Sequence, residues 1–261
     1  MARQSSNPVF QRSTALHESL RGTGQYAPSA DEVAGIYATP TRLTYDDIVV
    51  KTGILLGIIV VTGTAAWVGD LSTGAGALAG IVGFVLALVN MFKRKVSPPL
   101  VLAYAALEGV FLGAISHLYN DQFGGGIVTQ AVLGSTAVFA AVLFGYKSGK
   151  LRATPKFTKI VTLGFMGLFG LVVLDLVVSL FAGGDALGIR GGNVVTSVLF
   201  SVAFIVFGAL TFVLDFDQAE RMVEAGVDSR ESWRIAFGLV VGLVWLYLEV
   251  LRLLSYLQGR R

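Results

Sequence analysis

Four carboxylates lie in or at the end of long apolar stretches, where an isolated charge is costly. Glu108, Asp175 and Glu249 lie within such stretches, and Asp215 closes another. A carboxylate at the centre of a bilayer costs at least about 2.5 kcal/mol on insertion scales, so each one needs a partner, a cavity or a role. Arg252, three residues after Glu249, is the matching base. Buried acids of this kind can sense pH or line a path for cations.

Each acid also has a structural explanation. Glu249 and Arg252 share a helix face and could neutralise each other. Asp215 could be a helix-end residue in the headgroup layer, leading into the amphipathic stretch 217–224. Asp175 could be a protonated carboxyl that bonds to neighbouring backbone. Glu108 is hardest to explain in this way, because it lies in mid-stretch with no base within one helical turn.

Other kinds of chemistry lack the residues they require. The chain has no Cys and only two His, His17 and His117, so disulfides, thiolate metal sites and multi-histidine metal centres are excluded. His117 alone is typical of a solvated or hydrogen-bonded imidazole. No GxSxG or HExxH motif is present, and no Ser is a persuasive partner for His117. We expect neither an enzyme nor a bound cofactor, and the dispersed net charge of +3 argues against nucleic acid.

Composition and hydropathy predict an all-α integral membrane protein. The chain is 54% hydrophobic and 14% charged, with a mean hydropathy of +0.71, whereas soluble domains carry about 25% charged residues. An apolar run of about 20 residues spans a bilayer. Seven runs are long enough to be transmembrane helices, at 53–69, 75–92, 99–119, 127–146, 159–182, 194–215 and 235–257.

The charges between these runs predict the orientation. Lys and Arg are concentrated in the second, fourth and sixth connections, and the fifth holds only Arg190. Basic connections face the cytoplasm, so we expect a plasma-membrane protein with its N-terminus inside and its C-terminus outside, although Arg260 and Arg261 mildly oppose this. Residues 1–48 are polar and predict a flexible cytoplasmic tail, and 49–261 the transmembrane domain. No apolar run before Ile48 resembles a signal peptide.

Pairs of glycines four residues apart predict close helix packing. They occur at Gly53 and Gly57, Gly76 and Gly80, Gly109 and Gly113, and Gly238 and Gly242. None of them is followed by the Lys and Ser or Thr of a phosphate-binding loop.

Two segments carry a resemblance to a known family. The segment VLDFDQAERM, which contains Asp215, and the segment LYLEVLRLLSYL, which contains Glu249 and Arg252, resemble the paired signatures of the Bax-inhibitor-1-like family. The resemblance covers about the last 210 residues, and the tail before Thr44 is outside it. It implies seven helices with the last one central, and a pH-sensitive calcium leak in which two carboxylates share a proton.

The resemblance assigns roles to particular residues. It implies that Asp215 and Glu249 form the pH-sensing pair, and that Lys93 or Arg94 is a basic lock. Two carboxylates within hydrogen-bond reach titrate as a pair, so such a pair can sense pH. Glu108, Asp175 and Arg252 are further candidates for the ion pathway. Calcium, the expected permeant ion, prefers oxygen ligands, and Glu108, Asp215 and Glu249 could offer it transient sites.

A second function stays open beside the cation leak. The chain could be a membrane protein that binds and restrains a membrane protease or another membrane partner, as some bacterial relatives are thought to do. The long polar tail would then be the contact region. A proton-coupled transporter ranks below both, because no inverted repeat is evident.

Overall fold

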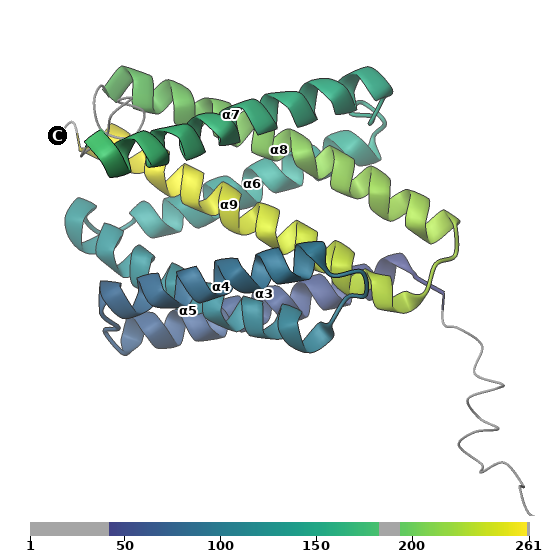
Figure 1. Ribbon diagram of the computed structural model, residues 1–261, viewed down its shortest axis with the longest axis horizontal. Helices are drawn as coiled ribbons and strands as arrows, with labels where there is room; N and C mark the ends of the chain where they lie inside the picture. The colour runs from purple at the N-terminus through teal and green to yellow at the C-terminus, as the bar shows by residue number, and fades with distance from the viewer. Residues whose placement is uncertain (1–41, 183–193, 260–261) are drawn as a thin grey trace, which may run out of the picture. The chain divides into compact units, whose positions relative to one another are not determined.

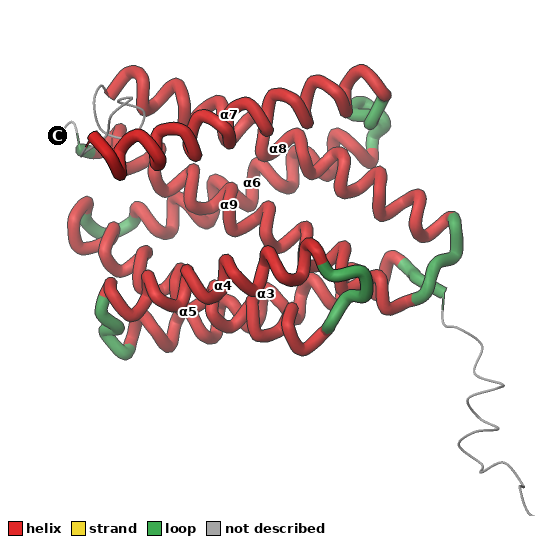
Figure 2. Tube along the Cα trace, viewed as in Figure 1, coloured by secondary structure: helices red, strands yellow, loops and turns green. Residues whose placement is uncertain are grey.

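Long helices dominate the computed structural model, which describes residues 42–182 and 194–259 (Figures 1 and 2). The described residues form α3 (Tyr45–Val68), α4 (Thr73–Phe92), α5 (Pro98–Phe123), α6 (Ile127–Lys147), α7 (Pro155–Ala182), α8 (Val194–Glu224), the short 3-10 helix η1 (Ser229–Glu231) and α9 (Ser232–Gln258). The seven α-helices are long and apolar enough to cross a membrane. The predicted all-α, seven-span architecture is confirmed. Arg190, Arg260, Arg261 and the tail up to residue 41 lie outside the described residues.

Two helices extend beyond the predicted apolar runs. α3 begins at Tyr45, within the predicted tail, because Thr44 and Asp47 form a capping box. The Asp47 amide donates to Thr44 Oγ1 at 3.2 Å, and the Thr44 amide donates to Asp47 Oδ2 at 3.2 Å. α8 continues past Asp215 to Glu224, because the stretch after Asp215 is amphipathic and stays helical beyond the apolar run.

The last helix, α9, lies between two groups of helices (Figure 1). It contacts α3 and α5 on one side and α6 and α8 on the other. Trp245 also reaches α7, with ring centroids 6.1 Å from Phe165 and 6.4 Å from Phe169. α4 packs mainly against α5. The central position of the last helix is therefore confirmed, with α4 forming an outer layer on α5.

Glycines allow the α3 and α5 backbones to touch. A Cβ on Gly113 would lie 2.2 Å from the Gly63 carbonyl oxygen, and a Cβ on Gly109 would lie 2.6 Å from the Ile59 carbonyl oxygen. These distances leave no room for a side chain. Gly76 and Gly80 pack in the same way against Ala114 and Phe111 of α5.

The other predicted glycine pairs behave differently. A Cβ on Gly53, Gly57 or Gly238 would meet no atom within 4 Å, so the expectation of close packing was wrong there. Gly242 does pack, against the ring of Phe212. Spacing along a helix cannot tell which face meets a neighbouring helix and which faces lipid.

Replacing Gly113 by Ala should lower the free energy of unfolding by about 1–3 kcal/mol, because overpacking forces two backbones apart. Gly57→Ala is the matched control, since it adds a methyl group in open space and improves helix propensity. Unfolding of the detergent-solubilised protein measures both. Equal stability of the two variants would contradict the α3–α5 contact.

Candidate functional site

The relative position of α8 and α9 is set by two contacts between small and aromatic residues. The Trp245 indole Cδ1 lies 3.6 Å from the position that a Cβ on Gly208 would take. Phe212 Cε1 lies 2.8 Å from the corresponding position on Gly242. Each step forward along α8 is therefore matched by a step back along α9, as expected for an antiparallel pair.

This register places the two acids of the predicted pair at different levels. Asp215 lies level with Gly238, in the early turns of α9, and Glu249 lies level with Phe204 on α8. The two carboxylates are thus separated by about ten residues, or about 15 Å along the helix axes. The register does not bring Asp215 and Glu249 together, because α8 runs on past Asp215 before the chain turns back.

Asp215 is half-buried on α8, and no hydrogen bond or ion pair joins it to any part of the chain that the structure describes. Its neighbours on the helix, Phe212 and Phe216, are aromatic and pack on Phe139 of α6. Asp215 is therefore a carboxyl within the bundle rather than an exposed residue at the end of a helix.

Glu249 is paired on its own helix. Its side chain is buried, and Arg252 Nη1 donates to Glu249 Oε1 at 2.8 Å. The Tyr256 side chain lies near both residues and near Ser197 of α8. The intrahelical ion pair predicted as the structural explanation of Glu249 is present.

Asp175 of α7 lies toward the same end of α8 and α9 as this pair. Its side chain is only 3% exposed. Gly164 of α7 packs against Phe207 of α8, and continuing that antiparallel register places Asp175 beside residues 196 and 197, about two turns beyond the level of Glu249. We name the polar residues of this end the polar layer, which spans about 10 Å along the helix axes; its members are Asp175, Ser197, Glu249, Arg252 and Tyr256. Three helices, α7, α8 and α9, contribute to it.

Glu108 lies in the other group of helices, at the α4–α5 contact. It is 8% exposed, and its Oε2 lies 3.2 Å from the position that a Cβ on Gly83 would take. It makes no hydrogen bond or ion pair within the described ranges. Glycine at position 83 leaves the space that this carboxyl occupies.

The basic lock candidates lie in the connection between α4 and α5. The Lys93 and Arg94 side chains are exposed. The backbone carbonyl of Arg94 accepts a hydrogen bond from Arg234 Nη2 at 2.7 Å, and Arg234 Nε donates to Glu231 Oε2 at 2.7 Å. This connection is therefore tied to the first turn of α9, on the side of Asp215 and far from Glu249.

Lys51 also holds the start of α9, and sequence reasoning missed it. Its ammonium donates to the Ser232 hydroxyl and to the Ser229 carbonyl, the latter at 3.2 Å. It lies 5.6 Å from the Trp233 ring centroid. A base just before the apolar run 53–69 was the available signal, but its partners come from a segment about 180 residues away.

Asn90 of α4 is a second residue that sequence reasoning missed. It is buried, and neither of its amide atoms has a hydrogen-bond partner in the part of the chain that the structure describes. It lies two turns along α4 from Gly83, the neighbour of Glu108. A single Asn at the end of an apolar run gives no sign of which side it faces.

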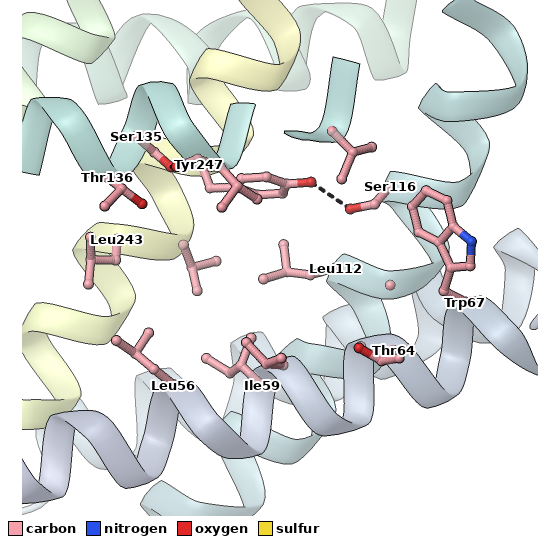
Figure 3. A pocket seen from close by; sticks show the side chains of 16 residues that line it. Leu56, Ile59, Thr64, Trp67, Leu112, Ser116, Ser135, Thr136, Leu243 and Tyr247 are labelled. Carbon is pink, nitrogen blue, oxygen red and sulfur yellow. Dashed lines mark hydrogen bonds between the residues drawn. The ribbon is translucent and has the colours of Figure 1, made fainter. Parts of the chain in front are cut away.

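A cavity of about 540 Å³ opens between α3, α5, α6 and α9 (Figure 3). Its lining is mostly apolar and includes no charged residue. The Tyr247 and Ser116 hydroxyl groups, which lie 2.7 Å apart, hydrogen-bond at one end of it. The cavity therefore does not join the candidate acids.

The acids do not gather into a metal centre. Across residues 42–182 and 194–259, no group of three His, Asp or Glu side chains could hold a metal ion. His117 lies 3.3 Å from Asp121 and 3.9 Å from Asp70, at the end of α5. Any calcium at Glu108, Asp215 or Glu249 would meet these carboxylates one at a time.

A family model described as Bax inhibitor 1 like matches residues 7–259. The chain belongs to this family. The match begins well before Thr44, so it extends over most of the tail that the two signatures left uncovered. Membership of the Bax inhibitor 1 like family and the seven apolar helices together identify a multi-pass membrane protein.

One curated relative is an uncharacterised protein of Chlamydia muridarum. It is 34% identical over 105 residues, which are 40% of this chain and 44% of the relative. The matched stretch thus spans less than half of the relative's length. This likeness adds no activity to the family assignment.

Replacing Arg252 should lower the free energy of unfolding by more than its partial exposure suggests. Arg252→Gln leaves a desolvated carboxylate without its base, and breaking a buried pair costs about 3–5 kcal/mol. In a Glu249→Gln background the same change should cost about 1 kcal/mol or less. Unfolding in detergent supplies the double-mutant cycle. The exposed pair of Arg221 and Asp217 is the control, and its double-mutant cycle should show almost no coupling. If the losses of unfolding free energy for the Glu249 and Arg252 variants simply added, the buried pair would not be coupled.

Proposed function

We propose that the protein is a pH-sensitive cation leak channel, with calcium as a permeant ion. The observation that carries the proposal is that α8 and α9, which pack against each other, place carboxyl groups within the bundle at two levels. Asp215 occupies one level, and Glu249 of the polar layer occupies the other. Acidic groups inside a membrane bundle are costly and mark ion or proton pathways.

Aromatic side chains separate the two levels. The Trp245 ring lies one turn from Glu249 and packs against Phe165, Phe169 and Phe204, with centroids 5.8–6.4 Å apart. Apolar constrictions of this kind gate channels by excluding water. In the proposed mechanism, an ion passes from one acid to the other only when helix movement opens this aromatic contact.

Protonation supplies the pH dependence. A carboxylate attracts a cation and opposes apolar packing around it, whereas the protonated acid does neither. Arg252 on its own helix pairs with Glu249, and the Tyr256 side chain lies near both of them. No charged group faces Asp215 among the described residues. The two acids therefore titrate in different surroundings, and we propose that they act as separate sensors rather than as one hydrogen-bonded pair.

Flux measurements with single and double variants distinguish separate sensors from a shared proton. Calcium entry into liposomes that contain the full chain should depend on pH, and Asp215→Asn and Glu249→Gln should each remove only part of that dependence. The double variant should remove both parts. The control is Asp121→Asn, an exposed acid in the last turn of α5, which should leave the flux unchanged.

Two outcomes would contradict the proposal. If either single variant abolished the pH dependence as completely as the double variant, the acids would act as one unit. If flux through the double variant equalled that of the unmodified protein at every pH, neither acid would take part.

Partner binding is the alternative function, and deletion of residues 2–40 tests it. A channel formed by the helical bundle should keep its calcium flux without this segment. Restraint of a membrane protease, assayed in cells, should be lost if the segment is the contact region. If the deletion instead abolished calcium flux and left protease restraint intact, the segment would belong to the channel and the partner contact to the helical bundle.

A further inference from the structure

A second cavity, of about 760 Å³, lies between the start of α7 and the end of α8. Ten residues line it: Ala153, Pro155, Thr158, Lys159, Thr162, Leu163, Asp217, Gln218, Arg221 and Met222. It shares no residue with the polar layer, with Asp215 or with the cavity of Figure 3. We propose that it binds the headgroup of an anionic phospholipid.

Charge is the first reason. Lys159 on the α7 wall and Arg221 on the α8 wall face one cavity. The segment from Lys147 to Lys159, which leads into α7, contains five basic residues and no acidic one. Basic clusters of this size at the cytoplasmic end of membrane helices attract anionic lipid.

The geometry of Arg221 favours a phosphate. Asp217 Oδ2 accepts a hydrogen bond from Arg221 Nε at 2.8 Å, and this contact occupies only one of the three guanidinium nitrogens. The terminal guanidinium nitrogens have no partner in the described chain, so they stay available for the two-pronged contact that arginine makes with phosphate oxygens. Lys159 likewise forms no ion pair there and can contribute a point charge.

The apolar side of the cavity favours a lipid over a free phosphate. Leu163 and Met222 line it beside the charged residues. On the α7 surface, Ile160, Leu163 and Met166 are 57–65% exposed, so an apolar strip runs from the cavity along the helix. A phospholipid offers a phosphate for the charged end and acyl chains for this strip, whereas inorganic phosphate offers only the first.

Lipid retention by the purified full chain tests the proposal. Native mass spectrometry after addition of dioleoyl phosphatidylglycerol or dioleoyl phosphatidylcholine should show preferential retention of the anionic lipid. Lys159→Gln and Arg221→Gln should each weaken retention about fivefold, as expected for loss of one charge near a membrane surface. Lys95→Gln, an exposed base in the α4–α5 connection, is the matched control and should change retention little.

A variant that gains affinity guards against misfolding as an explanation. Asp217→Asn removes the acid of the cavity, so it should strengthen retention of phosphatidylglycerol. Equal retention of the two lipids, or loss of retention in Lys95→Gln as large as in Lys159→Gln, would overturn the proposal. Displacement of the lipid by millimolar inorganic phosphate alone would also overturn it, because the site would then recognise phosphate without the acyl chains.

Discussion

The packing of α8 against α9 is the constraint on which the candidate site depends. Gly208 and Gly242 let the rings of Trp245 and Phe212 lie against the facing backbone, so the two helices have one register. That register, more than the identity of the acids, decides which polar groups meet. It places Glu249 level with Phe204, puts Ser197 about two turns further along α8, and leaves Asp215 among aromatic neighbours. In lipid, where apolar surface gives no preference between helices, such close packing supplies the specificity.

Burial of charge follows from this packing. The bundle accommodates Glu249 by supplying Arg252 one turn away, and it accommodates Glu108 by leaving the space beside Gly83. Asp215 has neither a paired base nor a glycine described beside it. At the other end of α9, Lys51 and Arg234 bond to Ser232 and to the backbone of Arg94, so the start of the helix is fixed to α3 and to the α4–α5 connection. A helix held at one end and surrounded by ionisable groups at the other is suited to respond to protonation.

The sequence predicted the seven helices well, because an apolar run long enough to span lipid has few other structures available. It also predicted the pair of Glu249 and Arg252, which depends only on helical spacing. It could not predict that Asp215 and Glu249 lie apart, because that depends on the length of α8 beyond Asp215 and on the glycine contacts. For the same reason Lys51 and Asn90 were missed: their surroundings come from distant segments. The start of α3 at Tyr45 was within reach, since Thr44 and Asp47 form a recognisable capping box.

The register of α8 and α9 can be measured directly, because the chain has no native cysteine. Cysteine pairs introduced at Phe212 with Gly242, and at Asp215 with Glu249, can be oxidised in membranes and compared by the fraction that forms an intramolecular disulfide. A disulfide needs Cα atoms within about 7 Å of each other. We expect efficient cross-linking at 212 and 242 and none at 215 and 249. Cross-linking at 215 and 249 without cross-linking at 212 and 242 would contradict the register, and with it the proposal of two separate acids.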